Sequence, residues 1–327
     1  MGTRIPKNSG RILTILSAIC ILFITFGIGP DKSPYYGIFE RINTFGLPKG
    51  YEQLADPAWN VLTYVISKFC LNDIGYFLVL AVVYVYANAY FCKFQTKYYV
   101  YTFIAVISFM GFYSYGINTI RAGVAISFLL IAMVKIEKSL LTYMLLSFVA
   151  IAIHKSVAIP AVIFLVTTYW NKPNISLCLW LTCLVVSFLT DGTLKDYVVL
   201  YLGDEDERIE NYIGVSQSEV YQVGFRWDFI IYSILPIIVG YYHISKALIR
   251  DEKYIRLFNT YVLTNAFWLI VITASFSDRF AYLSWFLYPY ILLLPFYNRL
   301  GLPAKTKTAT LYIVCIAGFN VAMTLMR

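Results

Sequence analysis

Long apolar runs separated by short polar segments occupy most of the 327-residue chain. Many runs have roughly the length that crosses a hydrocarbon core of about 30 Å at 1.5 Å per residue. The first run follows three basic residues but ends without a small-x-small cleavage site, so we expect an uncleaved span rather than a signal peptide. The clearest predicted spans lie near Ile12–Ile28, Ile74–Cys92, Tyr98–Tyr115, Ile120–Ile136, Ile175–Thr190, Phe229–Ser245, Leu257–Phe276, Phe280–Tyr297 and Thr308–Met326.

One apolar segment, Ser139–Trp170, is too long for an ordinary span and is interrupted by His154–Ser156 and Pro160. It forms either one overlong helix or two short helices that turn at His154. A turn places more than half of the 26 Lys and Arg residues in cytoplasmic loops. A single crossing would instead put the basic His243–Arg256 cluster outside, against the positive-inside rule. The charge pattern therefore favours a broken hairpin at His154, eleven crossings, a cytoplasmic N-terminus and an external C-terminus.

Two longer polar stretches, residues 31–71 and 191–226, are external loops in this arrangement. The end of the first, near residues 58–71, is too short to cross and is predicted to form an amphipathic helix at the outer interface. The predicted fold is an all-α polytopic membrane protein with about eleven transmembrane helices. We expect a single transmembrane domain over residues 1–327, with any chemistry on the outer side.

Composition supports lipid as the solvent of this chain. Hydrophobic residues make up 60% of it and charged residues only 13%, whereas soluble domains are typically about 45–50% apolar and 25% charged. The net charge of +8 comes mostly from short loops, not from a basic surface interleaved with aromatic residues, so we expect no nucleic-acid partner.

The residues that usually bind metals or cofactors are sparse. The six cysteines form no CxxC pair, and neither of the two histidines belongs to an HExxH pattern. Phosphate-binding glycine loops and a GxSxG elbow are absent from the sequence. We therefore expect neither a metal site nor a cofactor.

Charged side chains at membrane depth are costly unless they face a polar cavity or a partner, so each one is a functional candidate. In this chain they collect near the predicted outer boundary of the membrane. Their common level predicts a single wet cavity that opens away from the cytoplasm. The candidates are Arg121, His154, Lys155, Arg226, Asp228, Asp278 and Arg279.

These cations fit an anionic, lipid-borne substrate. Guanidinium groups bind phosphate through paired hydrogen bonds and stay charged at any working pH. Converging on one cavity, they could hold a pyrophosphate leaving group and stabilise the charge that develops on it. The candidate pyrophosphate ligands are Arg121, Arg226, Arg279 and Lys155.

A second role is to accept the proton of an attacking hydroxyl. The candidates are neutral His154 and three carboxylates, Asp228, Asp278 and Glu52. The sequence leaves open which of them acts as the base.

Structural roles compete with these chemical ones. Asp278 and Arg279 form a simple ion pair in one alternative, and His154 caps its hairpin in another. Lys155 is expected to extend to the interface rather than to take part in catalysis. Asp228 favours a helix N-terminus through the helix dipole.

At these same residues the chain resembles the EpsG-like, Wzy-type polymerases of bacterial surface polysaccharides. The family usually has Gln after the Arg of an N-x-x-R segment, where this chain has Ala122, so a role for a glutamine is not carried over. The segments that carry the resemblance occur in family order: Asp31 with Tyr35, Gly50–Leu54, Asn118–Arg121, His154–Ser156, Gly224–Phe229 and Ser277–Tyr282.

The resemblance implies a membrane glycosyltransferase at the outward face of the bacterial cytoplasmic membrane. It would join oligosaccharide repeat units carried on undecaprenyl pyrophosphate into O-antigen, capsule or exopolysaccharide. Donor and acceptor are both lipid-linked, and no nucleotide is required because the lipid pyrophosphate already activates the sugar. Membrane lipids are further expected partners, and a chain-length regulator protein is a candidate one.

Two other classes remain open. A flippase for the lipid-linked unit would also need basic residues, but spread along a path through both leaflets, and inverted repeats are not visible. A membrane O-acyltransferase would also use His and Arg, but its inner-facing acyl-donor site does not suit this charge distribution.

Overall fold

The computed structural model describes residues 8–29, 32–50, 57–70, 72–190, 193, 224–246, 248–274 and 277–297, with 311, 314, 315 and 318. The described residues form helices and their connections, with no strand among them. This confirms the prediction of an all-α protein. Three predicted features lie wholly or mostly outside the described residues: Glu52, the 191–226 loop and the Thr308–Met326 span.

The chain divides into two compact units. The first unit comprises Met1–Ala158 and Phe296–Arg327, and the second comprises Ile159–Pro295. The single transmembrane domain expected for residues 1–327 stays a prediction.

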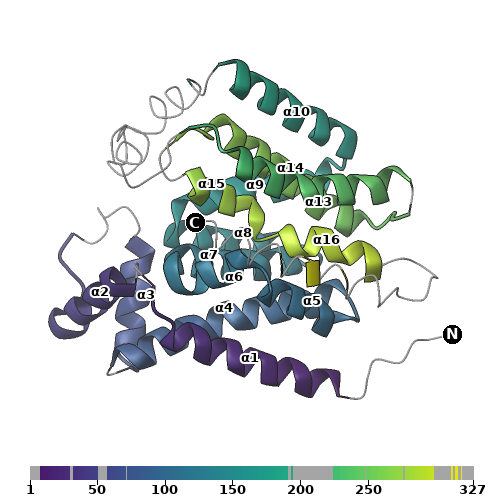
Figure 1. Ribbon diagram of the computed structural model, residues 1–327. Helices are drawn as coiled ribbons and strands as arrows, with labels where there is room; N and C mark the ends of the chain where they lie inside the picture. Colours follow the sequence, from purple (N-terminus) through teal and green to yellow (C-terminus); the bar gives the residue numbers. More distant parts are fainter. Residues whose placement is uncertain are drawn as a thin grey trace. The chain divides into compact units, whose positions relative to one another are not determined.

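The first unit is built around α1, α4 and the α7–α8 hairpin. Figure 1 shows α1 and α4 side by side, and α7 packs along both α4 and α8. Its elements are α1 (Ser9–Phe26), α2 (Lys32–Phe45), α3 (Pro57–Ser67), α4 (Asp73–Gln95), α5 (Tyr99–Ile107), α6 (Met110–Tyr113), the π-helix η2 (Ser114–Asn118), α7 (Ile120–Lys135), α8 (Leu140–Ile153) and the 3₁₀ turn η3 (Lys155–Val157).

α4 shows why this unit packs as it does. Tyr76, Leu80, Tyr84 and Asn88 recur every four residues, and all four are buried. Residues four apart lie on one face of a helix. The amide of Asn88 donates to the Tyr84 carbonyl at 3.0 Å, so this polar group is satisfied within its own helix. A large aromatic and aliphatic face can therefore contact α1 and α7 without leaving a buried polar group unpaired.

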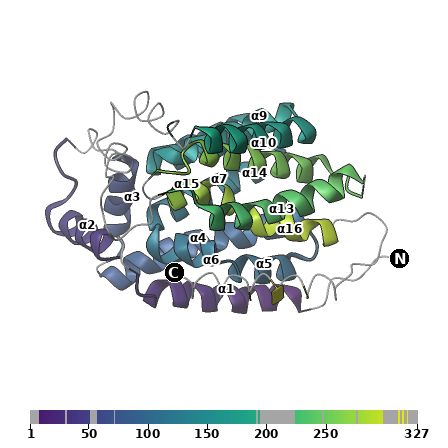
Figure 2. The same ribbon diagram turned by 45° about the horizontal axis from the view of Figure 1, so that its top comes forward.

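The second unit consists of helices that pack back and forth. Figures 1 and 2 both show α10 lying along α14, and α13 precedes α14 in a helical hairpin. α9 (Ala158–Tyr169) begins at the boundary between the units. The others are α10 (Pro173–Leu189), α13 (Trp227–Ser245), α14 (Glu252–Ile270), α15 (Ser277–Trp285) and α16 (Tyr288–Tyr297).

Among the described residues, three helices are long and apolar enough to cross a membrane alone: α1, α4 and α13. A fourth candidate is the pair Tyr99–Ile107 and Met110–Asn118, which is bent by 74° at its break. The helices Leu140–Ile153, Lys155–Tyr169 and Pro173–Leu189 are apolar but shorter. These apolar helices indicate a membrane protein, whereas the count of about eleven crossings stays a prediction.

The predicted break at His154 is present. α8 ends at Ile153, His154 is extended (φ −151°, ψ 105°), and η3 leads into α9. Pro160 disfavours one continuous helix through this segment, since it has no N–H to donate to the carbonyl of Ser156. The same residue is tolerated in the first turn of α9, where that N–H would have no helical partner.

Two predicted single helices are broken in the structure. The span expected over Phe280–Tyr297 forms α15 and α16 instead, because Pro289 cannot donate to the carbonyl of Trp285. The span expected over Tyr98–Tyr115 bends after α5. There the hydroxyl of Ser108 donates to the Ile104 carbonyl at 2.8 Å, a bond that often bends helices.

The stretch over residues 31–71, predicted to be external, holds two helices among its described residues where the sequence predicted one. The helix expected near residues 58–71 is present as α3, with Trp59, Thr63 and Ile66 buried and Val61 and Val65 exposed. This burial follows the helical period, as expected of an amphipathic helix. α2 precedes it and packs against it. The position of α3 at the membrane interface stays a prediction.

Candidate functional site

The α7–α8 hairpin brings two predicted site residues to one end of the first unit. α7 begins at Ile120 and α8 ends at Ile153, and residues 136–139 connect their opposite ends. The helices pack along each other, and η3 also contacts α7. Because the two helices are antiparallel, Arg121 in the first turn of α7 and His154 after the last turn of α8 lie at the same end of the hairpin.

The backbone before Arg121 is a π-helix, η2. Thr119 closes this turn, since its N–H and its hydroxyl both donate to the Ser114 carbonyl, at 2.8 and 3.3 Å. Gly123 lies against the Tyr115 carbonyl, so the first turn of α7 packs directly on η2. Single π-turns are rare and frequently occur at functional sites. Arg121 therefore projects from a tightly packed joint, and its Nε atom is buried.

The residues at the break between α8 and α9 differ in exposure. His154 and Ser156 are half-buried, whereas Lys155 is exposed. The half-buried imidazole of His154 lies at the same end of the α7–α8 hairpin as Arg121, and this environment suits proton transfer. The exposed ammonium group of Lys155 suits contact with an anionic headgroup. His154 and Lys155 are adjacent in sequence but differ in solvent exposure, which suits them to different roles.

In the second unit, Arg226 is held by its own neighbours. Its Nε and Nη2 atoms donate to the two carboxylate oxygens of Asp228, at 2.9 and 2.6 Å. Its guanidinium carbon lies 3.6 Å from the centre of the Phe229 ring. This bidentate pair occupies donors that Arg226 was expected to offer to a phosphate, and it occupies the carboxylate that was a candidate base.

α15 carries Asp278 and Arg279 in its first turn, and both side chains are half-buried. A carboxylate in this position is favoured by the helix dipole.

The direction of α15 follows from two contacts with α14. The rings of Phe267 and Phe280 lie 6.5 Å apart, and the amide of Asn265 donates to the Ser284 hydroxyl at 3.0 Å. α15 therefore runs antiparallel to α14, as α13 does. The first turns of α13 and α15, which carry the four charged residues of the second unit, consequently lie at the same end of that unit.

A buried polar network joins four helices of the second unit. Asn265 accepts from the Trp180 indole N–H at 2.8 Å and donates to the Ser233 and Ser284 hydroxyls, at 3.1 and 3.0 Å. Ser233 also accepts from the Trp285 indole N–H at 2.8 Å. All five residues are almost completely buried. The network links α10, α13, α14 and α15 and so fixes the helices that carry the charged first turns.

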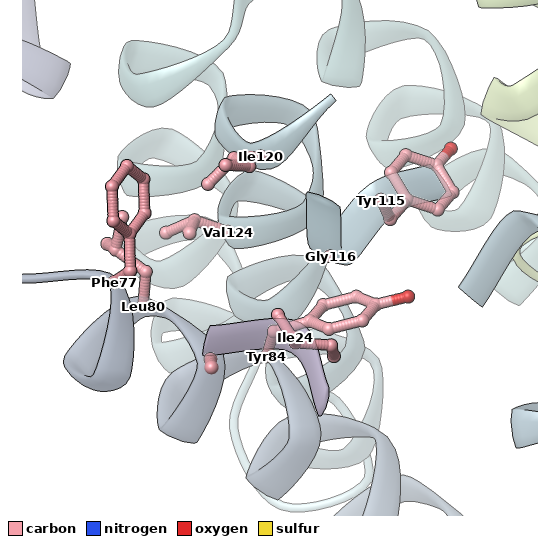
Figure 3. Close-up of a pocket in the computed structure, with 9 residues that line it drawn as sticks. Ile24, Phe77, Leu80, Tyr84, Tyr115, Gly116, Ile120 and Val124 are labelled. Atoms are coloured by element: carbon pink, nitrogen blue, oxygen red, sulfur yellow. The ribbon is translucent and has the colours of Figure 1, made fainter. Parts of the chain in front are cut away.

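Figure 3 shows a cavity within the first unit, between α1, α4, η2 and α7. The space inside it is small, about 10 Å³, which is room for about one water molecule. The lining is apolar except for the hydroxyl groups of two tyrosines. The lining residues are Ile24, Phe77, Leu80, Ala81, Tyr84, Tyr115, Gly116, Ile120 and Val124.

Lys32 lies beside this cavity and was not singled out from the sequence. Its Nζ atom donates to the carbonyls of Ile24 and Thr25, at 3.0 and 2.6 Å, and lies 4.8 Å from the centre of the Phe77 ring. Burial lowers the pKa of Lys32, and the Asp73 carboxylate partly opposes this effect. The available signal was a lysine close after an apolar helix, where it can reach the last carbonyls.

The predicted site residues thus form two groups. The structure gathers each group at one end of its own unit, and one cavity shared by both groups stays a prediction. In the described part of the chain, no cluster of three or more metal-ligating side chains is present. The groups are Arg121, His154 and Lys155 in the first unit, and Arg226, Asp228, Asp278 and Arg279 in the second.

Comparison with known protein families gives a match over nearly the whole chain. The sequence model of the EpsG family matches residues 11–326, which is nearly the whole chain. Neither a curated protein nor a solved structure matches it. The apolar helices and this match agree with the resemblance carried by the short sequence segments. The chain belongs to the EpsG family.

Proposed function

We propose that this protein polymerises lipid-linked oligosaccharide repeat units at the outward face of the bacterial cytoplasmic membrane. In the reaction, the anomeric carbon of the growing glycan loses its bond to the polyprenyl pyrophosphate. It forms a glycosidic bond to a hydroxyl of the incoming lipid-linked unit. The hydroxyl proton passes to a base, and polyprenyl pyrophosphate leaves. Membership of the EpsG family supports a role in polysaccharide polymerisation.

The observation that carries this proposal is the position of Arg121. It stands at the start of an apolar helix, directly after a π-turn, at the same hairpin end as His154. A charge at membrane depth is retained when it has a function or a partner. Arg121 holds the pyrophosphate in this proposal, because a guanidinium matches phosphate oxygens and stabilises the charge that builds on the leaving group.

Arg279 is the second proposed pyrophosphate ligand. It lies in the first turn of α15, where the polar network around Asn265 fixes the helix. Arg226 has a smaller proposed role in pyrophosphate binding, because two of its N–H groups already donate to the carboxylate of Asp228. Lys155 is exposed and is proposed to contact a headgroup rather than the reacting atoms.

His154 is the proposed base. Imidazole titrates near neutral pH and can accept a proton when it is neutral. His154 follows the last turn of α8 with an extended backbone, and its N–H donates to the Ala150 carbonyl at 3.0 Å. Asp278 is the alternative acid of the second unit, Asp228 is less suited because of its ion pair, and Glu52 lies outside the described residues.

Reconstitution tests the proposal directly. The purified full-length protein is placed in proteoliposomes with a synthetic oligosaccharide repeat unit on undecaprenyl pyrophosphate, and the glycans are resolved by size. We expect a ladder of polymers and release of the lipid pyrophosphate. A single band at the size of the starting unit would contradict a polymerase.

A deletion strain separates the two other classes. Surface glycans that carry only single repeat units indicate a polymerase, and loss of all surface glycan indicates a flippase. Full-length chains without acyl groups indicate an O-acyltransferase. We expect the first of these profiles.

A further inference from the structure

One face of α4 is exposed along most of the helix. Ile74, Leu78, Val82 and Tyr86 recur every four residues and are between 39% and 61% exposed, whereas the face toward α1 and α7 is buried. Residues four apart lie on one face of a helix. α4 is long and apolar enough to cross a membrane, so this exposed stripe is a surface that lipid chains can cover.

The stripe ends at a cation. Lys93 lies in the last turn of α4 and is exposed. It follows Tyr86 by about two helical turns, which places both residues on the same face. Its Nζ atom lies 5.8 Å from the centre of the ring of Tyr99, where α5 begins. An ammonium group beside an aromatic ring therefore stands at the end of the apolar stripe.

Two tyrosines lie between the aliphatic part of the stripe and this cation. The rings of Tyr86 and Tyr90 are stacked, with their centres 6.0 Å apart. The Nζ atom of Lys135, in the last turn of α7, lies 5.8 Å from the centre of the Tyr90 ring. Tyrosine is enriched where hydrocarbon meets the lipid headgroups. The ring pair therefore marks that boundary in the last turns of α4.

The local charge at this end is positive. Residues 90–101 and 130–141 contain the end of α4, the start of α5 and the end of α7. They carry four lysines and one acid, Glu137. Basic surfaces at the ends of transmembrane helices attract anionic headgroups. The same end of the helix thus offers an apolar stripe, an aromatic boundary and an excess of cations.

We propose that this end of α4 binds a phospholipid with a net negative charge, with Lys93 contacting the phosphate and one acyl chain along Tyr86 and Val82. The rise from Val82 to Lys93 is about 16 Å at 1.5 Å per residue. This is close to half of a hydrocarbon core of about 30 Å, so the stripe matches the depth of one leaflet. The lipid is not a reactant, and the site does not depend on the proposed polymerase function.

A purely structural role for Lys93 makes a different prediction. A cation in the last turn of a helix is stabilised by the helix dipole. In that case, replacing Lys93 would lower the unfolding temperature by the same amount with and without lipid. The lipid site predicts that the variant loses the additional stability that an anionic phospholipid provides.

Thermal unfolding of the purified, delipidated full-length protein in detergent tests the site. Phosphatidylglycerol should raise the unfolding temperature, because a ligand that binds only the folded state stabilises it. Phosphatidylethanolamine, which has no net charge, should raise it less. From the dependence on lipid concentration, we expect Lys93→Gln to weaken the affinity for phosphatidylglycerol roughly fivefold, as the loss of one cation near an anionic headgroup does.

Lys68→Gln is the matched control. Lys68 is also an exposed lysine beside a tyrosine, with its Nζ atom 4.5 Å from the centre of the Tyr64 ring. It precedes the first turn of α4, so it lies at the opposite end of the helix from Lys93. Lys68→Gln removes the same charge and should leave the affinity for phosphatidylglycerol unchanged.

Three results would overturn the site. The first is equal affinity of the wild type and Lys93→Gln for phosphatidylglycerol. The second is binding of phosphatidylethanolamine as tightly as phosphatidylglycerol, which would indicate general contact with lipid. The third is binding of glycerol phosphate as tightly as phosphatidylglycerol, which would exclude a contribution of the apolar stripe. If Lys93→Gln does not fold, the three ligands compared on the wild type still decide.

Discussion

At the scale of single residues, the arginines of this chain differ by their surroundings. Arg226 is bound by both oxygens of Asp228 and covered by the Phe229 ring. Arg121 instead starts a helix behind a π-turn, with its Nε atom buried. From the sequence, both guanidinium groups were candidate pyrophosphate ligands.

The ion pair predicts a ranking of activities. We expect Arg226→Gln to slow polymerisation only a few-fold, because Asp228 already balances that charge. Arg279→Gln should slow it roughly 10²-fold, the effect of removing one donor that stabilises a developing anion. Polymerisation rates in proteoliposomes measure both. A larger effect from Arg226 than from Arg279 would reverse the assignment.

The contact of Gly123 with the Tyr115 carbonyl predicts a stability change. A Cβ at Gly123 would collide with this backbone atom, so Gly123→Ala must separate α7 from η2. We expect a loss of roughly 1–3 kcal/mol, as for other overpacked sites, measured by thermal unfolding in detergent. Gly10→Ala is the control, since its Cβ meets nothing within 4 Å and alanine favours a helix. Equal unfolding temperatures of the two variants would refute the close packing.

At the scale of helices, the network around Asn265 predicts coupled effects on stability and activity. Asn265→Leu leaves the Trp180 indole N–H buried without its acceptor, which costs roughly 1–3 kcal/mol. It also releases α15, so polymerisation should slow even at temperatures where the protein is folded. Thermal unfolding and the glycan ladder measure the two effects.

Thr182→Val is the control for this helix network. The Thr182 hydroxyl donates to the Cys178 carbonyl of its own helix at 2.9 Å and is exposed. Its loss should change neither measurement appreciably. Wild-type behaviour of Asn265→Leu in both would show that the network does not position α15.

Local sequence signals account for some helix ends and not for others. The break at His154 was predictable, because Pro160 and three consecutive non-apolar residues interrupt the apolar run. Pro289 gave an equally direct signal for the α15–α16 break, but the apolar run around it suggested one span. The bend after α5 has no proline and coincides with a Ser108 hydroxyl bond to the Ile104 carbonyl, which hydropathy does not report.

At the scale of the whole molecule, hydropathy predicted the membrane class and the helical fold. It could not predict helix length in the folded state, since α15 and α16 have 9 and 10 residues within a run that looked continuous. It also could not predict Lys32, whose contacts depend on α2 folding back to the end of α1. Tertiary contacts, not local pattern, set both features.

The predicted topology is tested by labelling single cysteines. In a variant without the six native cysteines, Lys155→Cys at the break between α8 and α9 should react with an impermeant maleimide in intact cells. Lys138→Cys, in the loop before α8, should react only after permeabilisation. Both lysines are exposed, so burial does not explain a difference between them. Labelling of Lys138→Cys from outside would invert the topology.

The chemistry proposed for the outer side rests on a cation at the start of α7, and one comparison tests it. Arg121→Ala and Lys135→Ala remove a cation from opposite ends of the same helix, and Lys135 lies on the predicted inner side. In proteoliposomes with the lipid-linked repeat unit, we expect Arg121→Ala to leave only the starting unit and Lys135→Ala to give the wild-type ladder. A normal ladder from folded Arg121→Ala would contradict the role of this guanidinium in the reaction.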